Sequence, residues 1–247
     1  MNDSTTATSK NRAGFLESAM LKLFTRNARV LGIEDIGDTF RIVTLGGVAL
    51  RNAKWTPGDK IQIQFGGWVQ RTYTPIDWDA NNGRLRLLVY LHADGPGTQW
   101  GRALRKGDEC IVFGPRKSVD LTRLDTCAVV FGDETAIGLA AALRGAVQPA
   151  QLNLFLEVSS PADTQAVMAR FGLDNAHLGA RAENDAHLAV LEEKMLAVLQ
   201  AQPAAHIVLS GKASSIQRVG KALKRLGIGA GRFQNKAYWA TGKAGLD

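Results

Sequence analysis

The first half of the chain alternates apolar and polar residues in short runs that turn residues interrupt. The clearest run is Lys-Ile-Gln-Ile-Gln-Phe at residues 60–65, where every second side chain is apolar, as in a strand with one buried face. Similar runs predict six strands, at residues 28–35, 39–45, 60–65, 69–74, 84–91 and 109–113. Asn82-Gly83 is a strong hairpin signal between two of these runs. Short strands at this spacing predict a small, closed, antiparallel six-stranded β-barrel.

Beyond residue 121 the texture changes, and apolar strands alternate with helical segments. Strands are predicted at 128–131, 152–158 and 206–209, and helices at 134–144, 161–171, 185–200 and 214–226. The apolar stripes of the last two helices are Leu188, Leu191, Met195 and Leu199, and Ile216, Val219, Leu223 and Leu226, with Gly227 as a C-cap. Alternating strands and helices predict an α/β domain with a parallel sheet, of the nucleotide-binding type.

Three segments follow from these patterns. Residues 1–27 are expected to form a polar tail and a short amphipathic helix at 15–24, residues 28–122 the β-barrel domain, and residues 123–247 the α/β domain with a C-terminal tail. The 247 residues, 45% of them hydrophobic, are enough for two domains that each bury a core. The segment 15–24 is too short and too charged to cross a bilayer, so a cytoplasmic protein without membrane insertion is expected.

The net charge and the number of cysteines limit which partners and metal centres are expected. The formal net charge of +7 favours anionic partners, namely nucleotide phosphates, acidic metal chelates or an acidic protein. The cations form no single long run and no nucleic-acid-binding pattern, so nucleic acid is not an expected partner. Cys110 and Cys127 adjoin apolar runs and are expected to be buried free thiols, too few to hold an iron–sulfur cluster. The four histidines have no metal-ligand spacing, and no metal site is expected.

The strongest local motif is Arg71-Thr72-Tyr73-Thr74-Pro75. An arginine can clamp a phosphate with two hydrogen bonds, and a tyrosine offers a flat face for stacking. Alternation places Arg71 and Tyr73 on one face and Thr74 on the other, but Pro75 ends the ladder, and a bend there brings Thr74 to the same ligand. An ordinary strand with a surface arginine and a half-buried tyrosine is the alternative interpretation.

A glycine-rich turn follows at residues 92–104, His-Ala-Asp-Gly-Pro-Gly-Thr-Gln-Trp-Gly-Arg-Ala-Leu, and opens a short helix. Free backbone N–H groups at such a helix start form an anion site that suits a pyrophosphate. A tight turn at 106–108 then leads into a strand that ends in Gly114-Pro115-Arg116. Most glycine-rich turns only reverse the chain, so the anion site predicted here is supported mainly by the motif that precedes it.

In this order and spacing, the RxYT element, the HxDGP turn followed by Trp100, and the GPR strand exit resemble the siderophore-interacting protein family. These are FAD-dependent ferric-siderophore reductases of the ferredoxin-reductase-like superfamily. Segments 132–136 (GDETA), 209–214 and 237–242 are similar to further family turns, so the resemblance runs from about residue 28 to residue 245. Ile76 and Lys212 depart from it, since the family commonly has an arginine and a glutamate there.

The resemblance implies a role for each matching position. The implied FAD-binding residues are Arg71, Thr72, Tyr73, Thr74, His92, Asp94, Gly95, Gly97, Thr98, Tyr238 and Trp239. Tyr73 and Thr74 are the candidate catalytic residues, the first packing on the flavin and the second hydrogen-bonding near its reactive N5. The turn Gly132, Asp133, Glu134 and Thr135 would approach the nicotinamide nucleotide.

Lysines supply the remaining candidates. Lys212 follows a strand at a helix start and can pair with a nucleotide phosphate, or it is a solvated surface lysine. Ser159-Ser160 stands where an acidic residue would favour NADH, which leans the prediction towards NADPH over NADH. Lys236 and Lys243 beside the C-terminal aromatic residues suit an anionic aromatic chelate, or they are solvated cations of a packed tail.

The resemblance therefore predicts an FAD-dependent NAD(P)H oxidoreductase that reduces ferric siderophores and so releases ferrous iron. A flavin reductase that donates electrons to an acidic soluble redox protein or an oxygenase is the first alternative. A non-enzymatic siderophore-binding protein is the second, and it predicts neither bound flavin nor nicotinamide-driven reduction.

Overall fold

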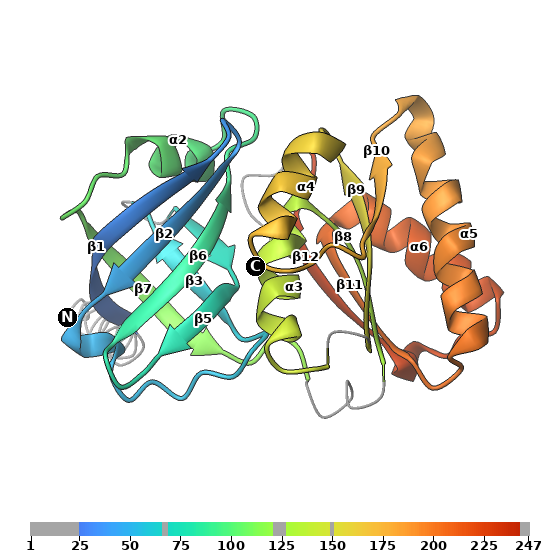
Figure 1. Cartoon of the computed structure of the whole chain (residues 1–247), viewed down its shortest axis with the longest axis horizontal. Coiled ribbons are helices and arrows are strands. Elements are labelled where there is room, and N and C mark those ends of the chain that lie inside the picture. The colour runs from blue at the N-terminus through green and yellow to red at the C-terminus, as the bar shows by residue number, and fades with distance from the viewer. Residues whose placement is uncertain (1–24, 66–68, 121–126, 149–150, 243–247) are drawn as a thin grey trace, which may run out of the picture.

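The computed structural model describes residues 25–65, 69–120, 127–148 and 151–242, which form two domains side by side (Figure 1). The predicted tail and short helix up to residue 24 lie outside the described residues, as do Lys243 and the predicted domain boundary between residues 122 and 123. None of the helices in the described part is both long enough and apolar enough to cross a membrane.

The N-terminal domain is an antiparallel sheet curled into a barrel-like shape. Its seven strands lie in the order β4-β3-β7-β1-β2-β6-β5. Their bounds are Thr25–Ile36 (β1), Phe40–Gly46 (β2), Lys60–Gln64 (β3), Gln70–Tyr73 (β4), Pro75–Asp79 (β5), Arg84–Tyr90 (β6) and Glu109–Arg116 (β7). The predicted antiparallel barrel domain is confirmed, with one strand more than the six predicted. The sheet is not closed, because β4 and β5 are its two edges.

The additional strand is β5, which pairs with β6 across the turn at the predicted Asn82-Gly83 hairpin. Pro75 was expected to end the ladder, but proline is tolerated as the first residue of an edge strand, where no partner needs its missing N–H. Thr74 alone links β4 to β5, so the chain passes from one edge of the sheet to the other at this residue. Thr74 therefore lies at the open seam of the barrel.

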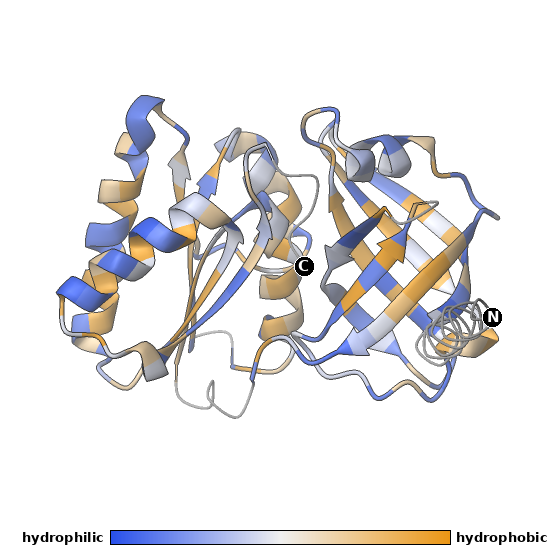
Figure 2. Cartoon of the chain, turned by 180° about the vertical axis from the view of Figure 1, so that it is seen from behind, coloured by the Kyte–Doolittle hydropathy of each residue, from blue (hydrophilic) through white to orange (hydrophobic). Residues whose placement is uncertain are grey.

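Apolar and polar residues alternate along the strands, which are therefore coloured in mixed orange and blue in Figure 2. The apolar side chains fill the interior of the barrel. Leu45, Leu85 and Val112 are fully buried in its interior, where each such side chain contributes about 1.5–3 kcal/mol by leaving water. Helix α2, Pro96–Ala103, leads from β6 towards β7 and packs on β6. The barrel is thus a rigid support for the turns at its rim.

The C-terminal domain is a parallel five-stranded sheet in the order β10-β9-β8-β11-β12. Its strands are Ala128–Asp133 (β8), Leu152–Val158 (β9), His177–Ala180 (β10), His206–Lys212 (β11) and Phe233–Trp239 (β12). Its helices are Ile137–Arg144 (α3), Pro161–Ala169 (α4), Ala186–Ala201 (α5) and Ala213–Arg225 (α6). α3 and α4 pack on one face of the sheet, and α5 and α6 on the other, as predicted for a nucleotide-type domain.

Two differences concern the edges of this sheet. β10 and β12 were not predicted, because β10 has only four residues and β12 mixes polar and apolar residues, as edge strands do. The stripe on α5 is buried as predicted, but on α6 Leu226 is 53% exposed because the helix ends at Arg225. Gly227 follows with φ of 76°, the left-handed conformation expected of a C-terminal glycine. Cys110 and Cys127 are buried free thiols, as predicted.

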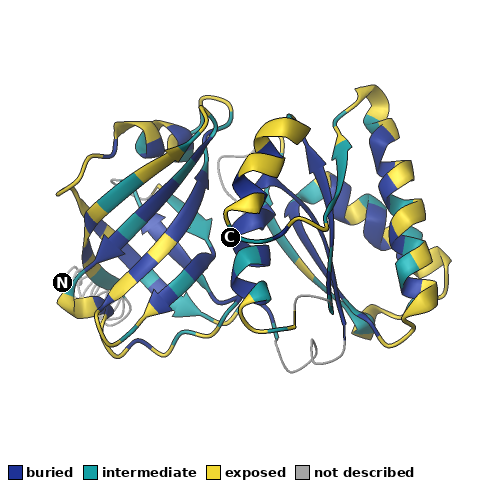
Figure 3. Cartoon of the chain, in the orientation of Figure 1, coloured by how far each residue is buried: buried dark blue, intermediate teal, exposed yellow. Residues whose placement is uncertain are grey.

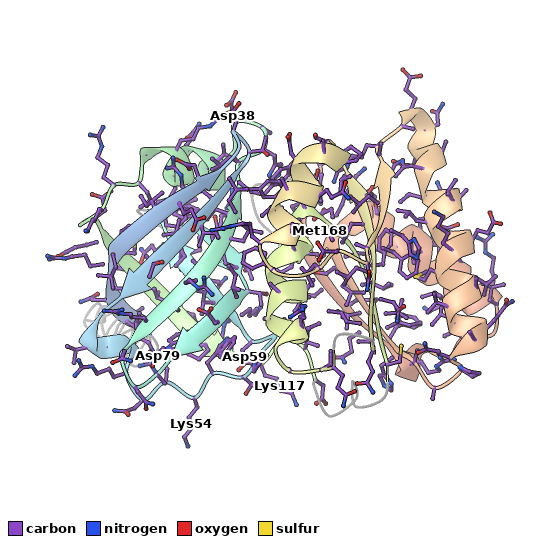
Figure 4. The ribbon with its side chains drawn as sticks, viewed as in Figure 1. Asp38, Lys54, Asp59, Asp79, Lys117 and Met168 are labelled. Carbon is purple, nitrogen blue, oxygen red and sulfur yellow. The ribbon has the colours of Figure 1, made fainter. Side chains whose placement is uncertain are left out.

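Helix α3 joins the two domains. It lies between the barrel and the parallel sheet (Figure 1) and is buried over most of its length (Figure 3). Its Ile137 shares one buried cluster with Phe40 and Leu88 of the barrel. Gly138 allows the close approach, since a Cβ there would lie 3.2 Å from the carbonyl oxygen of Thr74. Asp59 and Lys117 lie at the same junction (Figure 4), where burial raises the pKa of Asp59 against the attraction of Lys117. The close packing of the apolar side chains at this junction fixes the seam against α3.

Candidate functional site

A pocket opens where the barrel seam meets the carboxyl end of the parallel sheet. The empty space in it is ≈ 990 Å³, open solvent included. The predicted site residues that line it are Arg71, Thr72, Tyr73, Thr74, His92, Gly95, Gly97, Thr98, Thr135, Tyr238 and Trp239. Segments that lie far apart in the sequence therefore share one cavity.

The seam supplies one wall through four consecutive residues. Arg71 to Thr74 all line the pocket, because the chain bends between β4 and β5 instead of continuing the alternation. Arg71 spends one guanidinium donor on the carbonyl of Gln70, 2.7 Å away. The Tyr73 ring lies 5.9 Å from that of Trp100, and burial raises the pKa of its hydroxyl above the ordinary range. Arg71 thus offers a cation and Tyr73 a neutral aromatic face.

The start of α2 forms a second part of the pocket wall. Pro96 is the first helical residue, Gly95 caps the helix, and the Thr98 hydroxyl donates to the carbonyl of His92 over 2.6 Å. The first N–H groups of a helix have no partner within it, so they can bind an anion. A Cβ on Gly97 would lie 3.2 Å from the Tyr73 hydroxyl, so this turn packs directly on the seam.

The C-terminal strand closes the pocket from the other domain. The hydroxyls of Tyr238 and Thr74 hydrogen-bond each other across the junction, and burial raises the pKa of Tyr238 to about 12. The Trp239 indole donates to the Asp133 carboxylate over 2.7 Å. Asp133 is completely buried, which raises its pKa, while the Thr135 N–H, 2.8 Å away, stabilises the charge. Asp133 thus positions two pocket residues, Thr135 and Trp239.

Glu134 is buried behind the pocket wall and holds a hydrogen-bond network that the sequence did not reveal. Its carboxylate accepts from the Tyr90 hydroxyl (3.0 Å), the Ser159 N–H (2.6 Å) and two Arg181 nitrogens (2.9 and 2.7 Å). Burial opposes ionisation, but the hydrogen bonds from Arg181 and Ser159 outweigh it and lower the pKa of Glu134. Tyr90 also lines the pocket and was not predicted, although it lies two residues before the predicted His92.

Seven predicted residues do not line the pocket: Gly132, Asp133 and Glu134, which directly precede Thr135, and four that lie away from it or outside the described residues. The Asp94 side chain is 92% exposed and lies 3.8 Å from Arg102. The Lys212 ammonium lies 3.7 Å from the Asp185 carboxylate and does not line the pocket, although Lys212 pairs with Trp239 along β11 and β12. Lys236 is half-buried on β12, and Lys243 is not among the described residues.

Glu157, Asp185 and His187 form a cluster of metal-ligand type beside this edge of the sheet, with ligand atoms within 4.8 Å of one another. The Ala182 N–H donates to His187 Nδ1 (3.1 Å), so the imidazole proton resides on Nε2, which faces Glu157 at 3.0 Å. An Nε2 that carries a proton cannot bind a cation. The cluster therefore fits a buried hydrogen-bond network better than a metal centre.

Comparison with known proteins agrees with this geometry. Residues 64–119 match the model of the siderophore-interacting FAD-binding domain. A siderophore utilization protein from T. fusca is 22% identical with a TM-score of 0.71, over 90% of this chain and 95% of that one. The siderophore-interacting protein SipS from Aeromonas hydrophila is 19% identical with a TM-score of 0.70, over 89% and 93% of the two chains.

Another similar structure is the ferredoxin reductase in carbazole 1,9a-dioxygenase, with 17% identity and a TM-score of 0.68 over 87% of this chain and 68% of that one. No curated protein matches the sequence. The resemblance predicted from the sequence is thereby confirmed: residues 64–119 match the siderophore-interacting FAD-binding domain, and the whole chain shares its fold with these solved structures.

Proposed function

We propose that this protein is an FAD-dependent NAD(P)H oxidoreductase that reduces ferric siderophores. The main support is the shared pocket, where Arg71 and Tyr73 of the FAD-domain match face Thr135 and Tyr238 of the nucleotide-type domain. A redox cofactor in this pocket would border the carboxyl edge of a parallel sheet, which is where such sheets bind nucleotides.

The residues present fit FAD. Arg71 and the N–H groups at the start of α2 suit its phosphates, and a Cβ on Gly95 would meet nothing within 4 Å, so bare backbone faces open space. Tyr73 suits the flat flavin ring, and the Thr74 hydroxyl is placed to hydrogen-bond to its polar edge. Bound FAD would supply the redox chemistry, accepting a hydride and releasing electrons singly, while the protein positions it.

The nicotinamide nucleotide would lie along the turn of residues 132–135 and beside Ser159. No carboxylate follows Val158 directly, and the Arg181 guanidinium lies 2.7 Å from the Ser159 hydroxyl. A cation beside a serine suits the additional phosphate of NADPH, so NADPH is the proposed donor. Lys212 is a second proposed phosphate ligand once Asp185 releases it.

The proposed acceptor is an anionic ferric chelate. The FAD-domain match is of the siderophore-interacting kind, and a net charge of +7 attracts such a chelate. Reduction to ferrous iron weakens its binding by hard oxygen ligands and frees the metal. The proposed substrate contacts are Lys236, which lies on β12 with its aromatic residues, and Lys243, which follows β12 in the sequence.

A second candidate acceptor is a soluble acidic redox protein. The similarity to a ferredoxin reductase favours it, and so does the basic surface. An acceptor swap separates the candidates, since turnover of NADPH would depend on the ferric chelate in one case and on the redox protein in the other.

The deciding test is the visible spectrum of the protein with FAD before and after anaerobic NADPH. Bleaching of a bound flavin spectrum is the expected result, followed by ferrous iron formation from a ferric catecholate. A protein that takes up no FAD would refute the proposal and leave a siderophore-binding protein as the better account.

A further inference from the structure

One hydrogen bond joins the two domains behind the pocket wall. The Tyr90 hydroxyl at the end of β6 donates to the Glu134 carboxylate in the turn after β8, over 3.0 Å. The same hydroxyl lies 3.3 Å from the Ser159 hydroxyl. Glu134 is 2% exposed, so its carboxylate is shielded from bulk water.

The other hydrogen bonds to the Glu134 carboxylate come from its own domain. Arg181 approaches both carboxylate oxygens, and the Ser159 N–H binds one of them. Such charge-assisted, two-pronged pairs fix geometry as well as charge. The carboxylate is thus held rigidly by the α/β domain, and its contact to Tyr90 transmits that position to the barrel.

Tyr90 is the first ring of an aromatic wall. It stacks on His92 with ring centroids 4.7 Å apart and an angle of 14°, and His92 lies 5.7 Å from Trp239 at 50°. All three side chains line the pocket. Trp239 is tied by its indole N–H to Asp133, the chain neighbour of Glu134. The contacts therefore form a closed circuit that crosses between the domains twice.

We propose that Glu134 is a positioning residue, which orients the wall of Tyr90, His92 and Trp239 and so sets the angle at which a nicotinamide ring meets the flavin. This inference rests on the proposed function. A misplacement of about 1 Å in such a site can slow the chemical step about 100-fold. Arg71 and Gly95, which would hold the FAD phosphates, are not among the hydrogen-bond partners of Glu134, so the affinity for FAD is expected to change less than the rate of the chemical step.

The test uses the full chain and four variants. Glu134→Gln keeps the shape and removes the charge, and Tyr90→Phe keeps the ring and removes the hydroxyl. The double variant completes a mutant cycle. Glu192→Gln is the matched control, because Glu192 pairs with Arg218 at 3.2 Å on helices that do not line the pocket.

Two quantities are measured on each variant with FAD: the dissociation constant and the rate of anaerobic flavin bleaching by NADPH. Each single variant should slow bleaching by about tenfold or more, with a smaller change in the FAD dissociation constant. The double variant should be no slower than either single one, and Glu192→Gln should match the wild type. Wild-type rates in Glu134→Gln, or independent losses that multiply in the double variant, would overturn the proposal.

A measurement without cofactor separates this inference from the proposed function. The emission of Trp239 is obtained by subtracting the spectrum of Trp239→Phe from that of the wild type. In the Glu134→Gln background the same subtraction should give emission shifted to the red and more readily quenched by acrylamide. Unchanged Trp239 emission would refute the positioning role, whereas absence of FAD binding in the wild type would refute the proposed function alone.

Discussion

The Tyr238 hydroxyl on β12 hydrogen-bonds to the hydroxyl of Thr74, the single residue that links the two edges of the barrel-like sheet. The two residues are 164 positions apart in the chain, and they belong to different domains. This contact fixes the open seam of the barrel against the parallel sheet. It also places two polar groups, the buried Thr74 hydroxyl and the hydroxyl of the half-buried Tyr238, at the wall where the flavin is proposed to bind.

Removal of this contact should destabilise the chain. Tyr238→Phe leaves the buried Thr74 hydroxyl without its partner, which costs about 1–3 kcal/mol. Urea unfolding followed by circular dichroism measures the change. Thr74→Val should be similarly affected, Thr74→Ser should retain the bond, and the two losses should not add in the double variant. Full additivity would show that the two hydroxyls do not interact.

Arg71 should govern the affinity for FAD. Arg71→Ala removes a charge-assisted contact, which should weaken binding by about 1.5–3 kcal/mol. Fluorescence titration of FAD measures the effect. Arg86→Ala is the matched control, because Arg86 pairs with Asp77 on the barrel surface and does not line the pocket. If both variants bind FAD as the wild type does, Arg71 is not part of the site.

The sequence predicted those parts of the site that are contiguous. Arg71 to Thr74 and the turn from Gly95 to Thr98 could be recognised because strand periodicity and a helix start need only neighbouring residues. Tyr238 and Trp239 came from the family resemblance alone. The β5 strand was missed because Pro75 has two meanings in a sequence, the end of a ladder or the start of an edge strand.

The network around Glu134 could not be predicted. Its partners Tyr90 and Arg181 are 44 and 47 residues away, and nothing in local periodicity pairs them. Charged residues are usually solvated, so the burial of Glu134 depends on how the two domains meet. Lys212 shows the same limit, since its position at a helix start was correct but its contact with Asp185 was not foreseen.

Replacement of Gly138 by alanine should not stabilise the protein, although glycine-to-alanine changes stabilise most helices. Glycine in a helix costs about 0.5–1 kcal/mol relative to alanine, so Gly220→Ala on α6 should stabilise the chain, its Cβ meeting only Leu209 at 3.7 Å. In Gly138→Ala the Cβ would lie 3.2 Å from the Thr74 carbonyl, a backbone atom that cannot move away. That variant should show no gain, or a loss, in thermal melting. An equal gain in both would mean that α3 and the seam separate easily.

Glu134 should affect how the free energy of unfolding changes at acidic pH. Its hydrogen bonds from Arg181 and Ser159 outweigh burial and lower its pKa from the ordinary value of 4.5. A carboxyl group with a lowered folded pKa contributes stability above its unfolded pKa and loses it as the pH falls through the folded pKa. The free energy of unfolding in urea should therefore fall as the pH drops below about 4.5, and fall less in Glu134→Gln. Parallel curves for the wild type and Glu134→Gln would contradict the ionised Glu134–Arg181 pair.

Asp133, whose pKa burial raises, acts with the opposite sign, because its contribution to stability is lost as the pH rises from 3.8 through its folded pKa. Asp133→Asn should therefore make the free energy of unfolding fall more steeply on acidification, whereas Glu134→Gln makes it fall less steeply.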